Sequence, residues 1–379
     1  MVQTMQAPIS LSELESWLFE AANILRGPID AADFKTYIFP LLFFKRICDV
    51  FDEEYQIALA EADGDIEEAS YRENFRFYIP NNCHWQEVRE HTENVGSAIA
   101  HAMRCIEKEN SQTLSQIFGD VQWGNKERLP DRLLNNLIEH FSEKTLSNAN
   151  VEPDMAGRAY EFLIKKFADE SNKAAGEFYT PRNVIKLMMK ILKPQEHESV
   201  YDPAVGTAGM LLEALNYAQS HSGNIHLLHL YGQEKNLTTS SIARMNLILH
   251  GREDFEIVRG DTLRNPAFVE NDRLKTFDCV VANPPFSLKK WGEEVWEHDP
   301  YGRNFAGMPP SSYGDYAWVQ HMISSMANPG GRMAIVLPQG ALFRKGAEGK
   351  IRKTLLEMDF IEAVIGLGPN LFYGTTLAA

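Results

Sequence analysis

Paired cysteines are missing from this sequence. Its four cysteines, Cys48, Cys83, Cys105 and Cys279, lie far apart, and none belongs to a C-x-x-C pair. This spacing disfavours a disulfide framework and the common structural zinc sites, and scattered free thiols are typical of a reducing compartment. His101 stands four residues before Cys105, on the same face of a helix, but no second pair accompanies them. We therefore predict no metal site.

Long apolar runs and a secretion signal are also missing. No apolar stretch reaches the roughly 18–20 residues that a membrane helix needs, and the N-terminus has no basic segment followed by an apolar run. Hydrophobic residues make up 44% of the chain and charged residues 23%, which are ordinary values for a folded globular protein. We expect a cytoplasmic protein that does not contact a membrane.

Positive charge is scarce. The chain has 37 Lys and Arg residues against 52 Asp and Glu residues, a formal net charge of −15. Most of the imbalance lies in residues 1–150, which contain 13 basic and 25 acidic residues. A surface of this sign repels the phosphate backbone, so tight non-specific binding of nucleic acid by the isolated chain is disfavoured. To act on nucleic acid, the chain needs a local basic patch or a basic partner.

A length of 379 residues predicts two or three domains, and the hydrophobic pattern changes near residue 150. In the first part, apolar residues at helical spacing predict helices over 12–26 (capped by Ser12), 31–61, 84–110 and 130–145. Pro40 is expected to kink or split the second helix.

In the second part, short apolar runs alternate with helical segments, which predicts an α/β domain with a mainly parallel sheet and helices on both faces. The predicted strands are 199–202, 225–232, 256–260, 277–282, 333–337 and 360–365. The predicted helices are 182–192, 208–220, 237–250, 315–327 and 346–357.

Acidic residues follow the first three predicted strands. Asp202, Glu234 and Asp261 stand where each strand ends, and ligands of parallel sheets bind at these ends. A carboxylate after the second strand can accept hydrogen bonds from both hydroxyls of a ribose. The small-residue loop 202–209 contains no basic side chain to hold a bare phosphate. The pattern therefore favours S-adenosylmethionine over NAD or ATP.

The fourth predicted strand ends in the tetrapeptide Asn283-Pro284-Pro285-Phe286. Two prolines fix the backbone, so the Asn283 side chain and the carbonyl of Pro284 are held as acceptors in one orientation. Together they can accept both hydrogens of an exocyclic amino group, and Phe286 offers a flat face on which a flipped base can stack. The alternative is a rigid proline turn that merely closes a strand.

These segments together resemble the modification (M) subunits of type I restriction-modification systems, which belong to the N6-adenine DNA methyltransferases. The matching segments are 177–182, 202–210, 231–234, 260–263, 283–286, 314–317 and 370–375. The resemblance covers nearly the whole chain. It implies a Rossmann-like S-adenosylmethionine-dependent methyltransferase sheet over residues 151–379, preceded by an all-helical N-terminal domain over residues 1–150 that docks on partners or DNA.

The resemblance also implies roles for individual residues. The methionine end of the cofactor would be lined by Glu177, Phe178, Tyr179, Thr180, Pro181 and Arg182. Its amino-acid part would be held by Asp202, Thr207, Ala208 and Gly209, and Gly206 would also bind the cofactor. Its ribose would be held by Glu234 and its adenine amino group by Asp261. The target adenine would be held by Asn283, Pro284, Pro285 and Phe286. Read locally, Thr180 is instead a cap for a helix begun by Pro181.

The expected partners are inferred from two sources, the lack of a domain that could read a DNA sequence and the resemblance to the family. No third domain remains to read a DNA sequence, and an acidic domain can dock on a basic partner. The resemblance implies a specificity (S) subunit, a restriction (R) subunit, double-stranded DNA and two M subunits per complex. It also implies a further strand and a C-terminal helical region beyond Ala379, so the chain is expected to be truncated.

Several alternatives stay open. The same fold can serve as an inactive scaffold, and the same turn can methylate cytosine N4 or the amide of a protein glutamine. The family usually has Gly where this chain has Ala208, and alanine there costs on the order of 1 kcal/mol if φ is positive.

Residues 287–312 contain several basic and aromatic residues, namely Lys289, Lys290, Trp291, Trp296, Tyr301, Arg303 and Phe305. This stretch is expected to contact nucleic acid, with a plain surface loop as the alternative.

Overall fold

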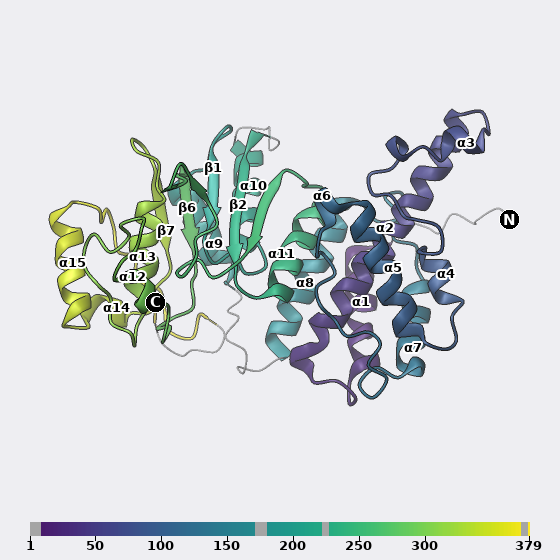
Figure 1. Cartoon of the computed structure of the whole chain (residues 1–379), viewed down its shortest axis with the longest axis horizontal. Coiled ribbons are helices and arrows are strands. Elements are labelled where there is room, and N and C mark those ends of the chain that lie inside the picture. Colours follow the sequence, from purple (N-terminus) through teal and green to yellow (C-terminus); the bar gives the residue numbers. More distant parts are fainter. Residues whose placement is uncertain (1–8, 171–179, 222–226, 373–377) are drawn as a thin grey trace. The chain divides into compact units, whose positions relative to one another are not determined.

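The computed structural model describes residues 9–170, 180–221, 227–372 and 378–379 and separates into two compact units (Figure 1). The helical unit comprises Met1–Ser171 and Arg244–Glu253, and the sheet unit comprises Asn172–Ala243 and Asp254–Ala379. The end of one helix of the second half thus packs with the helical unit, which no local pattern in the sequence indicates.

The helical unit contains no strand among its described residues, as predicted. Its elements are α1 (Leu11–Leu25), η1 (Ala31–Asp33), α2 (Phe34–Glu61), α3 (Ile66–Ala69), η2 (Arg72–Asn74), α4 (Trp85–Arg89), α5 (Val95–Glu109), α6 (Ser111–Leu114), α7 (Asp131–Ser142) and α8 (Pro153–Glu170). Pro40 lies inside α2 and does not split it. Every residue of α2 from Tyr37 to Phe51 is buried, so packing outweighs the one backbone hydrogen bond that proline removes.

Two local predictions for this unit are wrong. The cap of α1 is Ser10 and not Ser12, because Ser10 Oγ accepts a hydrogen bond from the backbone N–H of Glu13 at 3.3 Å. The helix predicted over 84–110 is divided into α4 and α5 by residues 90–94. The start of α5 is held by Asp131 of α7, whose carboxylate accepts from the backbone N–H of Val95 at 3.0 Å. A cap supplied from such a distance leaves no local signal.

The sheet unit contains a five-stranded sheet in the order β3-β2-β1-β6-β7. Its strands are β1 (Ser199–Asp202), β2 (His229–Glu234), β3 (Phe255–Arg259), β6 (Cys279–Ala282) and β7 (Arg332–Ile335), and all neighbours are parallel. A small antiparallel hairpin, β4 (Val269–Glu270) with β5 (Arg273–Leu274), precedes β6. The helices are α9 (Arg182–Leu192), α10 (Gly209–His221), α11 (Leu237–Leu249), α12 (Glu293–Trp296), α13 (Asp315–Ser324), α14 (Gly340–Phe343) and α15 (Ala347–Glu357).

The parallel sheet predicted from the sequence is confirmed, except for its last strand. Residues 360–365 form no strand, and most of their apolar side chains are exposed, with Val364 at 62% and Ile365 at 50%. An apolar run predicts a strand only where a neighbouring strand accepts its hydrogen bonds, and none of the described residues pairs with this run.

The strand order places a topological switch between β1 and β6. From β1 the chain moves outward to β2 and β3 and then returns to β6 on the other side of β1. Tyr201 and Val280, which are register partners, pack with Met322 of α13 in one core cluster. Their neighbours Val200 and Val281 are also fully buried and point to the opposite face, so both faces are covered. Ligands of such sheets bind at the carboxyl ends of the strands beside the switch.

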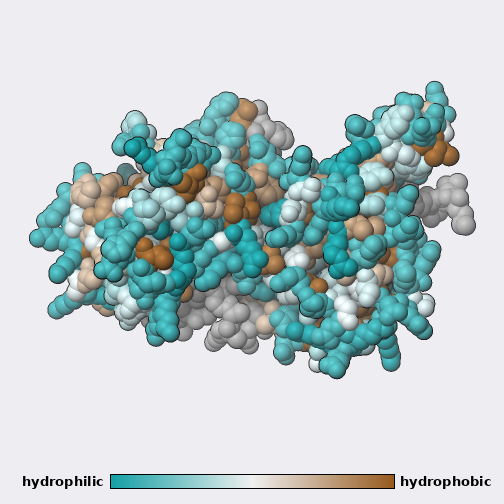
Figure 2. All heavy atoms as spheres, in the orientation of Figure 1, coloured by the Kyte–Doolittle hydropathy of each residue, from teal (hydrophilic) through white to brown (hydrophobic). Residues whose placement is uncertain are grey.

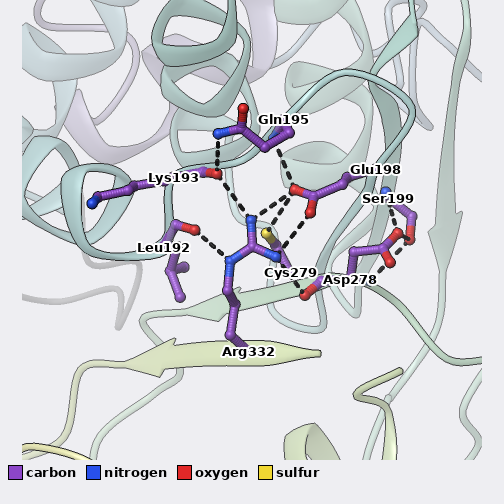
Figure 3. A network of polar contacts seen from close by, with 8 residues as sticks. All are labelled: Leu192, Lys193, Gln195, Glu198, Ser199, Asp278, Cys279 and Arg332. Carbon is purple, nitrogen blue, oxygen red and sulfur yellow. Dashed lines mark hydrogen bonds and ion pairs between the residues drawn. The ribbon is translucent and has the colours of Figure 1, made fainter. Parts of the chain in front are cut away.

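The amino ends of the same strands are tied together by a polar network (Figure 3). Arg332 of β7 donates to both carboxylate oxygens of Glu198 at 3.0 and 2.7 Å and to the carbonyl of Lys193, which follows α9, at 2.9 Å. Asp278 accepts from the hydroxyl and the backbone N–H of Ser199, both at 2.8 Å. These bonds link α9, β1, β6 and β7 at the amino ends of the strands, away from the carboxyl ends where ligands bind. The network therefore has a structural role.

Hydrophilic residues cover most of the molecular face drawn in Figure 2. Among the helices in the described ranges, none combines the length and the apolar character required to cross a membrane.

Candidate active site

Three carboxylates stand on neighbouring strands at the carboxyl edge of the sheet. Asp202 ends β1, Glu234 ends β2, and Asp261 follows β3 by two residues. Because these strands are adjacent in the order β3-β2-β1, the structure brings together the three acidic residues singled out in the sequence. Such a row favours a ligand with positive charge or with hydroxyl groups to donate.

Asp202 is the most deeply buried of the three, at 2% exposed. Its Oδ1 accepts a hydrogen bond from the backbone N–H of Ala204 at 3.0 Å. Burial raises the pKa of this carboxyl to about 8, and the charge of Glu234 adds to the rise, whereas the bond from Ala204 opposes it. Burial therefore favours the neutral form of this carboxyl in the free protein, and a cation beside it would favour the ionised form.

Glu234 connects the loops that follow β1 and β2. Its Oε2 accepts from the backbone N–H of Gly206 at 3.1 Å, and its Oε1 accepts from that of Asn236 at 2.8 Å. Each carboxylate oxygen can accept a second hydrogen bond, so the group can hold the loops and still receive a hydroxyl.

Asp261 is paired with basic side chains that the sequence pattern did not single out. Lys235 Nζ lies 2.9 Å from its Oδ2, and Arg264 Nε lies 3.7 Å from the same atom. The side chain of Lys235 is 75% exposed, so solvent weakens this pair. Lys235 directly follows Glu234 at the end of β2, and this position was the sequence signal that could have identified it as a residue of the site.

The loop after β1 adopts the backbone conformation that glycine favours. Gly206 has a φ of +54° and Ala208 a φ of +66°, so the condition under which alanine is costly at position 208 is met. Ala208 is fully buried and its carbonyl accepts the N–H of Leu212 at 3.0 Å. Thr207 precedes it, and Gly209 begins α10. The loop thus leads into the amino end of a helix at the carboxyl edge of the sheet.

We expect Ala208→Gly to leave the melting temperature nearly unchanged. Relief of left-handed strain, about 1–2 kcal/mol, offsets the loss of one buried methyl and the greater freedom of glycine in the unfolded chain. The matched control is Ala214→Gly in α10, which is also fully buried but helical. It should cost about 2 kcal/mol, from helix propensity and the lost methyl. Equal losses in thermal melts of both variants would contradict strain at position 208.

Asn283 follows β6, on the other side of the switch from Asp202. Its Nδ2 donates to Thr180 Oγ1 at 2.9 Å, whereas its Oδ1 is buried and has no hydrogen-bond partner within the described ranges. Thr180 therefore does not cap α9, whose first residue is Arg182 and whose cap position, Pro181, has no side-chain hydrogen bond. The local interpretation of Thr180 as a helix cap is wrong, because its hydroxyl is used to orient Asn283.

The residues that follow Asn283 in the predicted site are at least half-buried. Pro284 is buried, and Pro285 and Phe286 are half-buried. The ring of Phe286 lies 5.8 Å from that of Phe372, edge to face. Glu177, Phe178 and Tyr179 lie outside the described residues, as do residues 373–375.

The sequence did not single out the buried ion network behind this turn. The backbone N–H of Ser287 donates to Asp315 Oδ1 at 2.8 Å, and Arg344 pairs with Asp315 Oδ2 and, at 2.6 Å, with Glu348 Oε2. The side chains of Asp315 and Glu348 are 1% and 2% exposed. The Arg344 guanidinium also lies over the ring of Tyr313, 4.2 Å from its centre. The network ties the segment after Phe286 to α13 and α15.

The prediction for residues 287–312 is wrong for its largest side chains. Trp291, Trp296 and Arg303 are at most 2% exposed. Trp296 Nε1 donates to the carbonyl of Leu263 at 2.7 Å, and Arg303 pairs with Asp299 at 2.6 Å. These residues form a core under the loop and are not available to nucleic acid. Lys289, Lys290 and Phe305 remain exposed, so a smaller surface is left for that role.

The strand order and the residues at the strand ends define a Rossmann-like fold of the S-adenosylmethionine-dependent methyltransferase class. Residues 151–379 match the N-6 DNA Methylase family and residues 14–141 match the HsdM N-terminal domain. The chain therefore belongs to the N-6 DNA methylase family, and the expected relationship to type I modification subunits is confirmed.

Relatives of known name agree with this assignment. The chain is 34% identical to the type I restriction enzyme MjaVII methylase subunit of Methanocaldococcus jannaschii over 77% of its own length and 50% of that subunit. It is 30% identical to the HindI methylase subunit of Haemophilus influenzae, over 79% of this chain and 71% of that subunit. The chain thus spans about half the length of the MjaVII subunit and 71% of the HindI subunit.

A solved structure shows the same fold. The methyltransferase subunit of a type I restriction-modification system from Streptococcus thermophilus matches with a TM-score of 0.82 and 29% identity, over 97% of this chain and 83% of that one.

Proposed function

We propose that this chain methylates the N6 amino group of adenine in specific DNA sequences, as the modification subunit of a type I restriction-modification complex that uses S-adenosylmethionine. The observation that carries the proposal is the buried Oδ1 of Asn283, a fixed acceptor that has no partner among the described residues. It lies after β6 in the Asn-Pro-Pro-Phe turn, across the switch from the carboxylates at the ends of β1 and β2. An acceptor so placed suits an amino group.

The proposed chemistry requires the protein to reshape a poor nucleophile. The lone pair of the adenine amino nitrogen is delocalised into the ring. Hydrogen bonds from its two hydrogens to Asn283 Oδ1 and to the Pro284 carbonyl favour a more tetrahedral nitrogen, whose lone pair is then available for attack. Thr180 holds the amide of Asn283 in the orientation that presents Oδ1. Phe286 would stack on the flipped base and fix its plane.

The side chains at the strand ends fit the cofactor. S-adenosylmethionine supplies a methyl group on a positively charged sulfonium. Asp202 suits its ammonium group, Glu234 suits the two ribose hydroxyls and Asp261 suits the adenine amino group, since all three offer acceptor oxygens. Gly232 keeps the β2 backbone close to its neighbours, because a Cβ there would lie 2.7 Å from Ile257 Cδ1 and 2.9 Å from Val205 Cβ.

Glu234→Ala is expected to weaken S-adenosylmethionine binding by about 10–100-fold. Hydrogen bonds to a charged acceptor contribute roughly 1.5–3 kcal/mol, and the bond to Gly206 is lost as well. Isothermal titration calorimetry measures the change. Glu256→Ala on β3 is the matched control, since this glutamate is exposed on the neighbouring strand and should leave binding unchanged. Normal binding by a folded Glu234→Ala variant would remove Glu234 from the cofactor site.

Cofactor binding at pH 7 should release about one proton from Asp202. Its folded pKa of about 8 lies above the ordinary value of 3.8, so this carboxyl stabilises the free protein most below pH 4, and the stabilisation is lost as pH rises through about 8. With an ammonium group beside it, the Asp202 carboxyl would ionise and release its proton to the buffer. The observed binding enthalpy should therefore differ between phosphate and Tris buffers. Asp202→Asn should abolish that difference, and a difference of the same size in this variant would refute the assignment.

The proposed partners are a specificity subunit, a restriction subunit and double-stranded DNA, with two modification subunits per complex. Support comes from the names of the relatives, which are subunits of type I restriction enzymes, and from the acidic excess in residues 1–150. We expect the isolated chain to bind S-adenosylmethionine but to show no site preference on duplex DNA in gel shifts at physiological salt. Adding the specificity subunit should produce both affinity and selectivity.

Mapping the modified base in DNA treated with the reconstituted complex tests the function. N6-methyladenine within one recurring sequence is the expected product. N4-methylcytosine would identify the other exocyclic amino target, and transfer to a protein glutamine would replace DNA as the substrate. A complex that binds the cofactor but methylates nothing would support an inactive scaffold.

A further inference from the structure

Folding places Cys83 beside the pair His101 and Cys105, so three side chains that can bind a metal ion lie together. All three precede the predicted methyltransferase residues in the sequence. His101 and Cys105 lie on α5, one turn apart, and Cys83 comes from the segment before α4. One ligand atom from each of the three side chains lies within 4.8 Å of the other two. Cys105 Sγ is 3.6 Å from His101 Nε2. The sequence spacing predicted no metal site, because Cys83 stands 18 residues before His101 and belongs to no recognisable pair.

The elements that carry these ligands are fixed by the core of the helical unit. Ile99, Ala102, Met103 and Ile106 of α5 are at most 3% exposed, so this helix is anchored along the face beside the ligands. Cys83 is itself 1% exposed, and its backbone N–H donates to the carbonyl of Pro80 at 3.1 Å in a turn. Cys105 is half-buried and His101 is exposed. The cluster thus runs from the core to the surface, so an ion can enter from solvent.

The donor set selects the kind of ion. Two sulfurs and one imidazole nitrogen suit a thiophilic or borderline cation and do not suit Mg²⁺ or Ca²⁺, which prefer oxygen ligands. A tetrahedral zinc ion, with Zn–S bonds near 2.3 Å and Zn–N bonds near 2.0–2.1 Å, holds a sulfur and a nitrogen roughly 3.6 Å apart. The Cys105–His101 separation equals this value, and small side-chain rotations close the remaining distances.

We infer that Cys83, His101 and Cys105 bind a zinc ion that links α5 to the segment before α4. Three protein ligands leave the fourth tetrahedral position to water or to an outside donor. Both cysteines are free thiols in the structure, so they are available as ligands. The ion would stabilise the helical unit and takes no part in the methyl transfer proposed above, so the two proposals can fail separately.

The test uses tag-free protein, purified under reducing conditions, loaded with zinc and dialysed. Plasma mass spectrometry should find about one zinc ion per chain. Replacing zinc with Co²⁺ should give visible absorption typical of tetrahedral cobalt and a near-ultraviolet thiolate-to-cobalt band. Thermal melts should show a higher melting temperature with zinc than after chelation.

The variants Cys105→Ser and His101→Asn should each weaken zinc binding by about 100-fold or more, because each removes a direct ligand. Both positions are less buried than Cys83, so circular dichroism should report a folded protein. Cys279→Ala and His91→Asn are the matched controls and should bind zinc normally. Zinc or cobalt binding that survives loss of both ligands, a loaded protein that retains no zinc, or a native Cys83–Cys105 disulfide in peptide mass spectrometry would each overturn the inference.

Discussion

Replacing Asn283 with alanine should lower methyl transfer by about 1,000-fold or more while S-adenosylmethionine binding stays within a factor of about two. Asn283 Oδ1 is the buried acceptor offered to the target amino group, and no described residue replaces it. The carboxylates assigned to the cofactor belong to β1, β2 and the segment after β3, so they keep their positions. Single-turnover methylation by the reconstituted complex measures the first effect, and calorimetry measures the second.

Thr180 provides the control for this prediction. Thr180→Val removes the acceptor for Asn283 Nδ2 with little change in shape, so the amide can rotate and methyl transfer should fall by about tenfold. Thr180→Ser keeps the hydroxyl and should remain near the unmodified rate. Substantial methylation by the Asn283→Ala complex, or equal rates for Thr180→Val and Thr180→Ser, would contradict the roles assigned to these residues.

The carboxyl edge of the sheet was predictable because its signals are local. A parallel strand ends where its apolar run ends, so Asp202, Glu234 and Asn283 could be placed at strand ends from sequence alone. The strand order then brings these ends together without further information. The sequence predicted that alanine at position 208 is costly if its φ is positive. It could not predict the sign of φ, because the folded loop sets that angle.

The residues that fix the site were not predictable, because their partners are distant in the sequence. Aromatic and basic residues between 287 and 312 read as a surface for nucleic acid, yet Trp296 and Arg303 bond to backbone carbonyls near Leu263. Thr180 was predicted to cap a helix, yet its hydroxyl accepts a hydrogen bond from the side chain of Asn283, 103 positions later in the sequence. Local patterns identify which side chains carry chemistry, whereas long-range packing decides which of them are exposed.

Arg344→Met should lower the free energy of unfolding by about 3–5 kcal/mol, because it leaves two buried carboxylates without their cation. Asp315 and Glu348 are 1% and 2% exposed, and Arg344 contacts both. Methionine fills much of the same volume, so the lost charge rather than a cavity dominates. Chemical denaturation of the variant and of the unmodified chain measures the loss. Lys353→Met on α15 is the control, since its pair with Glu357 is exposed and contributes little.

Neutralising the carboxylates distinguishes charge from packing. If uncompensated charge causes the loss, adding Asp315→Asn and Glu348→Gln to Arg344→Met should restore most of the stability. The side chain at position 315 still has an oxygen to accept the backbone N–H of Ser287, so the segment after Phe286 stays bonded to α13. A triple variant as unstable as Arg344→Met alone would show that the Arg344 side chain acts through its stacking on Tyr313 and its packing instead.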